Sequence, residues 1–113
     1  MRKTITMTFC VTIVAGLLLT NFVFAEGNAR KGKYTYRKVY QSCMDRGEVQ
    51  SAVPTLSPDA KTQAQWDQFF TDKKYLEMEC KTEWSALSPE DIENIHAYLR
   101  DHAADSPTPA KCK

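Results

Sequence analysis

The residues of this chain that could bind a metal ion or react are mainly sulfur-bearing. Cys43 and Met44 are adjacent, and Met78 follows 34 residues later. A cysteine thiolate is a nucleophile and a soft-metal ligand, and a methionine thioether binds soft metals. Cys43 has no neighbouring histidine and falls near the C-terminal end of a predicted helix, where the helix dipole opposes a thiolate. The acidic residues are scattered without a general acid/base pair. We therefore expect that the chain is not an enzyme.

The two histidines do not add a second ligand set. His96 and His102 are six positions apart on one predicted helix, so they face different directions. His96 falls on the predicted buried face of that helix. We expect it to be a hydrogen-bonded core or interface histidine rather than a metal ligand.

The N-terminus has the pattern of a secretory signal peptide. Arg2 and Lys3 precede a largely apolar stretch without charge, which lasts until Glu26 and ends in Val23-Phe24-Ala25. We predict that residues 1–25 are removed and that the protein is periplasmic or secreted. The uncharged stretch is also long enough for a retained anchor, so the protein would contact a membrane only if this segment stays uncleaved.

The net charge of the chain gives no indication of nucleic-acid binding. Without Arg2 and Lys3, 13 of the 15 basic residues remain against 14 acidic ones, a net charge near −1. This balance does not indicate a nucleic-acid partner. One local basic cluster has two interpretations, a solvated helix face or a docking patch for an acidic partner. It consists of Arg30, Lys31, Lys33, Arg37 and Lys38.

Three cysteines remain after residue 25, namely Cys43, Cys80 and Cys112. Export to an oxidising compartment favours one disulfide. We predict a Cys80–Cys112 bond, because it would fasten the polar tail to the domain and leave Cys43 as the odd thiol. Loop-closure entropy gives such a bond about 3–4 kcal/mol.

The hydrophobic pattern predicts an all-α domain over residues 26–104. A first helix should run from about Ala29 to Met44 after the N-cap Asn28, with its aromatic residues and Cys43 on one face. A second should run from Asp59 or Lys61 to Asp72. Residues 73–87 should be irregular or a short helix.

The last helix has the clearest start, and the segment after it should not be helical. Ser88-Pro89-Glu90-Asp91 is a capping-box pattern with proline at the first helical position. Residues 105–113 contain two prolines and should form an extended tail, fixed only by Cys112.

Together these spacings resemble the small class I c-type cytochromes over about residues 28–104. Gly32, Tyr36, Cys43-Met44 and Gly47 follow the spacing of that family's N-terminal helix, and Leu87–Leu99 resembles its last helix. The resemblance implies that these two helices cross, with a middle helix and loops between them, and that glycine and aromatic residues form the contact. Gly32, Tyr36 and Tyr98 match those contact positions.

The haem-attachment positions depart from the family pattern. A covalent haem site reads Cys-x-x-Cys-His, and here those positions are Tyr40, Gln41, Ser42, Cys43 and Met44. Of the two haem-attachment cysteines that the family has, this chain therefore has only the second, Cys43. The resemblance places Tyr40 where the first cysteine should be, Met44 where the proximal iron ligand should be, and Met78 as a candidate distal ligand. The family predicts haem, but these substitutions argue against covalent attachment.

Two functions compete on this basis. The first is an exported cytochrome-c-like accessory or binding module, a protein partner within a periplasmic electron-transfer system, that has lost covalent haem. The alternative is a working monohaem electron carrier whose haem is held by Cys43 or by methionines. If haem is lost, the space must be filled, and we predict that Tyr40 fills part of it with help from Trp66 or Phe70.

Overall fold

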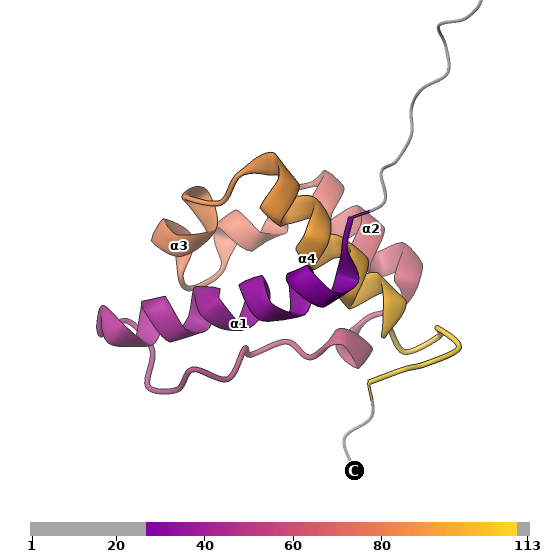
Figure 1. The fold of residues 1–113 in the computed structure, drawn as a ribbon, viewed down its shortest axis with the longest axis horizontal. Helices are drawn as coiled ribbons and strands as arrows, with labels where there is room; N and C mark the ends of the chain where they lie inside the picture. The colour runs from indigo at the N-terminus through magenta and orange to yellow at the C-terminus, as the bar shows by residue number, and fades with distance from the viewer. Residues whose placement is uncertain (1–26, 111–113) are drawn as a thin grey trace, which may run out of the picture.

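The computed structural model describes residues 27–110. This part of the chain contains six helical segments and no strand (Figure 1). The all-α prediction is confirmed. The segments are the α-helices α1 (Ala29–Asp45), α2 (Gln63–Thr71), α3 (Lys81–Ser85) and α4 (Pro89–Asp101), with 3-10 turns η2 (Pro58–Ala60) and η3 (Lys74–Glu77) between them.

Local capping residues set where the longer helices begin. The Asn28 side chain accepts the Lys31 N–H at 3.0 Å at the start of α1, as predicted. Ser88 forms a capping box with Asp91 at the start of α4, also as predicted. Helix α2 begins later than expected, because Thr62 forms a capping box with Gln65 and the preceding Pro58–Ala60 forms a separate 3-10 turn.

Helices α1 and α4 cross in close contact at Gly32 (Figure 1). A Cβ atom on Gly32 would overlap the carbonyl oxygen of Asn94, so only glycine permits this approach. The Asn94 side chain accepts the Asn28 N–H at 2.7 Å and is 5% exposed. Beside the crossing, the Tyr36 and Tyr98 rings lie 6.3 Å apart. The predicted crossing near Gly32 and Tyr98 is therefore present.

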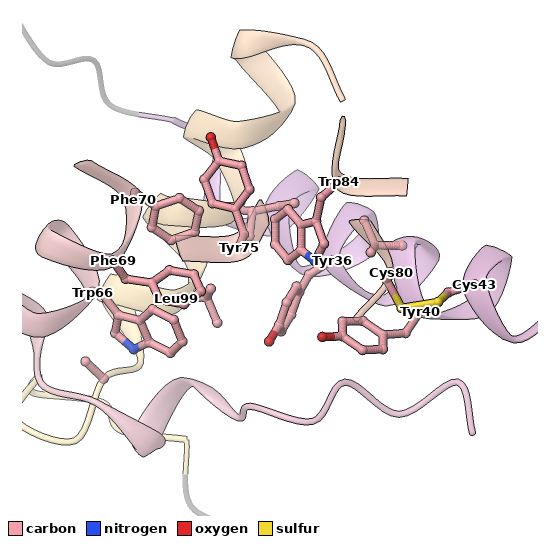
Figure 2. Close-up of a cluster of buried hydrophobic side chains, with 13 residues drawn as sticks. Tyr36, Tyr40, Cys43, Trp66, Phe69, Phe70, Tyr75, Cys80, Trp84 and Leu99 are labelled. Atoms are coloured by element: carbon pink, nitrogen blue, oxygen red, sulfur yellow. A yellow bond between two sulfur atoms is a disulfide. The ribbon is translucent and has the colours of Figure 1, made fainter. Parts of the chain in front are cut away.

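A continuous aromatic cluster fills the space enclosed by the helices (Figure 2). Ring centroids are 6.0 Å apart for Tyr36 and Trp84, 5.0 Å for Trp84 and Tyr75, and 5.5 Å for Tyr75 and Phe70. The cluster continues through Phe69 to Trp66, whose indole N–H donates to the Pro58 carbonyl at 2.7 Å. This row of rings joins α1, α2, η3 and α3 into one core.

The C-terminal residues 105–110 do not depend on Cys112 for their position. Asp105 accepts the Gln63 N–H at 2.8 Å, and the Ala110 N–H donates to the His102 carbonyl at 2.9 Å. Ser106 is buried. The prediction of a tail fixed only by Cys112 is wrong for this part, because its own hydrogen bonds hold it against α2 and α4.

The predicted signal segment, residues 1–25, lies outside the described residues, as does Cys112. Among residues 27–110, each helix is too short or too polar to cross a bilayer.

Candidate functional site

The cysteine predicted as a residual haem-attachment position is bonded to another cysteine. Cys43, in the last turn of α1, forms a disulfide with Cys80, the residue before α3, and their Cα atoms are 5.5 Å apart (Figure 2). Both residues are fully buried. The predicted Cys80–Cys112 disulfide is therefore wrong, because Cys80 can form only one such bond.

The disulfide changes what Cys43 can do. A sulfur already bonded to another sulfur has no thiol to add to a haem vinyl group, to act as a nucleophile or to bind a metal as thiolate. The Glu83 carboxylate lies within 4.8 Å of both sulfur atoms. Because both sulfur atoms are in the disulfide and Glu83 is paired with Arg46, the side chains of Cys43, Cys80 and Glu83 do not form a thiolate metal site while the disulfide is intact.

Tyr40 lies inside the core, as the volume argument predicted. It is fully buried and packs edge-on against Tyr36, with ring centroids 5.8 Å apart. Its hydroxyl donates to the Glu79 carboxylate at 3.2 Å and lies 3.3 Å from the Thr55 hydroxyl. Burial raises the pKa of this phenol, which therefore stays neutral at ordinary pH.

The aromatic neighbours of Tyr40 differ from the predicted ones. Trp66 and Phe70 pack at the other end of the cluster, and Tyr36 is the aromatic partner of Tyr40. That this volume corresponds to a haem position stays a prediction.

A charged network surrounds the disulfide, and sequence reasoning missed it. Arg46, the residue after α1, donates through Nε and Nη2 to both Glu83 oxygens at 2.8 Å, and also to Glu48 at 2.6 Å. Glu48 in turn accepts the Cys80 N–H at 2.9 Å. This network fixes the backbone of Cys80, whose φ of +67° is otherwise unfavourable for a residue with a side chain. The sequence signal was weak, because Arg46 and Glu83 are 37 positions apart, and Glu48 and Cys80 are 32 positions apart.

These contacts lower three carboxyl pKa values. The Cys80 N–H and then Arg46 lower the pKa of Glu48, and Arg46 lowers the pKa of Glu83. Glu79 precedes Cys80 in the chain. The Thr55 hydroxyl donates to the Glu79 carboxylate at 2.6 Å and lowers the pKa of that carboxyl. All three groups therefore favour the ionised form in the folded protein.

The remaining predicted ligand positions lie on three different segments: Met44 in α1, Met78 directly after η3 and His96 in α4. Met44 is half-buried in the last turn of α1, and Met78 is half-buried against the core. His96 stacks on Phe70 at 4.6 Å, and its Nε2 lies 2.7 Å from an Asp67 oxygen. His96 is thus the satisfied interface histidine that we expected.

The larger of two grooves described on the protein lies elsewhere, between α1 and residues 52–58, and has a volume of about 790 Å³. The second lies on the other flank of α1 and has a volume of about 510 Å³. Neither is lined by Cys43, Met44, Met78 or His96. The haem-attachment and iron-ligand positions that the cytochrome resemblance singled out therefore do not line a shared groove, whereas the helix-contact positions Tyr36 and Tyr98 both line the larger one.

Comparison with family models, with curated proteins and with solved structures finds no match to this chain. The resemblance to class I c-type cytochromes consequently rests on the residue spacings given above.

Proposed function

We propose that this chain is an exported, cytochrome-c-like binding module that acts beside electron carriers without a covalent haem of its own. One observation carries the proposal: the surviving attachment cysteine, Cys43, is used in a disulfide with Cys80. Thioether formation needs a free thiol, so the chemistry that would fasten a porphyrin is replaced by a bond that fastens two helices.

The helix crossing supports the cytochrome-c-like part of this proposal. The resemblance leads one to expect that glycine and aromatic residues meet where the terminal helices cross. Gly32 lies against the Asn94 backbone, and Tyr36 lies beside Tyr98. Other all-α proteins can cross helices at a glycine, so the crossing supports the ancestry through its combination with the sequence spacing.

The residues present do not fit a covalently attached haem. Tyr40 cannot form a thioether and already fills core volume, and Cys43 is oxidised. Methionine at position 44 is a weaker iron ligand than the expected histidine and favours reduced iron. A Met44–Met78 ligand pair for unattached haem is the alternative. Neither of these two side chains lines either of the two grooves, which argues against this ligand pair.

The test is the mass and absorbance of the mature protein made in a host that matures c-type cytochromes. We expect a mass that fits the chain without a haem adduct, and no Soret absorbance. A stoichiometric haem adduct would show that the electron-carrier alternative is correct. A Soret band removed by organic extraction, without an adduct, would indicate haem held by methionines and would likewise overturn the proposal.

A further inference from the structure

We propose that the groove between α1 and residues 52–58 is a docking site for an acidic, amphipathic segment of a partner protein. This inference deepens the proposed binding function by naming its surface and the chemistry of its partner. It does not depend on the absence of haem.

The charges of α1 are the first observation. The helix contains five basic residues, and its one acidic residue, Asp45, is its last residue. None of the five forms an ion pair with another residue of the described chain, since the ion pairs found there involve other cations. The five are Arg30, Lys31, Lys33, Arg37 and Lys38.

Three of these cations, Arg30, Lys31 and Lys33, also lie near the unfavourable N-terminal end of the helix. The N-terminal turn of an α-helix carries a partial positive charge, so cations there destabilise the helix and cations at the C-terminal end stabilise it. Helix α1 has no acidic residue in its first turn and no basic residue in its last turn. The charge distribution near the N-terminus therefore opposes the stability of α1, and Arg37 and Lys38 add two cations without an ion pair in the described chain in the middle of the helix.

Two of the five cations, Arg37 and Lys38, line the groove, which has two unlike walls. Tyr34, Arg37, Lys38 and Gln41 of α1 line one wall. The other wall is formed by residues 52–58, which contain no charged residue before Asp59. Half-buried and buried apolar groups, including Leu56 and the Tyr36 ring, close the space between the walls.

Exposed apolar side chains mark both walls. Tyr34 on the α1 wall is 67% exposed, and Val53 on the opposite wall is 72% exposed. They are the exposed large hydrophobic residues of the described chain. Exposed apolar groups beside a concave surface are typical of a protein interaction site.

These features favour a protein segment over other anionic partners. A ligand between a cationic wall and an uncharged wall must carry its negative charge on one side and apolar groups on the other. An amphipathic helix with carboxylates along one face has this property. A nucleic acid or a bilayer surface would place phosphates against the uncharged wall as well, and a flat bilayer would not enter the groove.

The probe is a fluorescein-labelled synthetic helix with glutamate on one face and leucine on the other, tested by anisotropy. A scrambled peptide of the same composition is the control ligand. We expect the patterned peptide to bind at least about tenfold more tightly, and raising the salt to about 0.5 M to weaken it, because exposed ion pairs are screened. Phosphatidylglycerol vesicles and a single-stranded oligonucleotide are the competing probes. Tighter binding to either would overturn the proposal in favour of that class of partner.

Charge-reversal variants locate the site. The double variant R37E/K38E should weaken peptide binding by about tenfold or more, because two favourable contacts become repulsive. The matched variant K73E/K74E makes the same change at an exposed adjacent pair that does not line the groove, and should change binding by less than about twofold. Equal losses in both variants would mean non-specific attraction and would contradict the docking site.

Tyr34→Ser tests the apolar contribution without altering charge. The side chain is exposed, so the variant should fold, and peptide binding should weaken about fivefold. An unchanged affinity would contradict the groove as the binding surface.

The absorbance spectrum of the same preparation separates the two proposals. Haem-free protein that fails to bind the patterned peptide refutes only the docking site, and haem-containing protein that binds it refutes only the loss of haem.

Discussion

At the scale of single residues, Gly32 determines how closely the two longest helices approach. In an isolated helix, replacing glycine with alanine stabilises by about 1 kcal/mol. Here the added Cβ would overlap the Asn94 carbonyl, so α1 and α4 would have to separate. We expect Gly32→Ala to lower the free energy of unfolding by about 2 kcal/mol, measured by urea denaturation.

The control for this variant is Lys33→Ala, one residue further along the same helix. Lys33 is exposed, so its replacement should change stability by less than about 0.5 kcal/mol. A Gly32→Ala protein as stable as the wild type would show that the helices do not cross in contact at this position.

At the scale of secondary-structure elements, the Cys43–Cys80 disulfide joins the end of α1 to the start of α3. The bonded residues are 37 positions apart, and loop-closure entropy for that separation gives about 4 kcal/mol. We expect the double variant Cys43→Ala/Cys80→Ala to lose about this much stability in urea denaturation. Reductant should destabilise the wild type by a similar amount and leave the variant unaffected.

Peptide mapping tests the pairing independently of stability. Trypsin cleavage after Lys38, Arg46, Lys74 and Lys81 should release residues 39–46 and 75–81 as one species linked by the disulfide. Recovery of the 75–81 peptide joined to one containing Cys112 would restore the pairing first predicted from the sequence.

The network around this disulfide should make stability depend on pH. The carboxyls of Glu48, Glu79 and Glu83 have pKa values below their ordinary value of 4.5 in the folded protein. A lowered pKa contributes stability that is complete above about pH 4.5 and is lost as the pH falls through the folded value. We therefore expect the protein to lose stability on acidification below about pH 4.5, measured by urea denaturation across a pH series.

Arg46→Gln isolates the part that Arg46 contributes. Without the guanidinium, Glu48 and Glu83 lose part of their preference for ionisation, so the variant should be less stable near neutral pH. The difference from wild type should shrink as both carboxyls become protonated. Arg37→Gln is the matched control, because Arg37 has no ion pair with a described residue, and its curve should run parallel to the wild type. A pH-independent difference for Arg46→Gln would contradict this assignment.

The sequence predicted those elements whose signals are local. Asn28 and Ser88 marked the starts of α1 and α4, because a cap acts within one turn of its helix. The start of α2 was placed too early, since Pro58 and Asp59 resemble a helix start but form a separate 3-10 turn. The Cys43–Cys80 bond and the Arg46 network were not predicted. Both depend on how far-separated segments meet, and cysteine spacing alone does not determine connectivity.

At the scale of the whole molecule, the aromatic cluster is part of one continuous hydrophobic core. Among the described residues, the core is not divided into two parts by an empty cavity. The hydrophobic core that contains the aromatic cluster extends from Trp66 in α2 to the Cys43–Cys80 disulfide and includes Ile95 and Leu99 of α4 (Figure 2). A protein that had lost a large cofactor without filling the space would have a weak contact between the parts on either side. The rings of Tyr36, Trp84 and Tyr75 instead form consecutive contacts that join α1, α3 and η3.

One continuous core should unfold in a single cooperative transition, and the two tryptophans allow each end to be observed. Trp66 lies in α2 and Trp84 in α3, and both are almost fully buried. In the variants Trp66→Phe and Trp84→Phe, the remaining tryptophan reports one end by fluorescence, while circular dichroism reports all helices. Within each variant, the two signals should give the same urea midpoint, because a two-state protein shows coincident transitions. If α2 unfolded before α3 in these measurements, the core would consist of separable parts, and the continuous packing between Trp66 and Trp84 would not hold the molecule together.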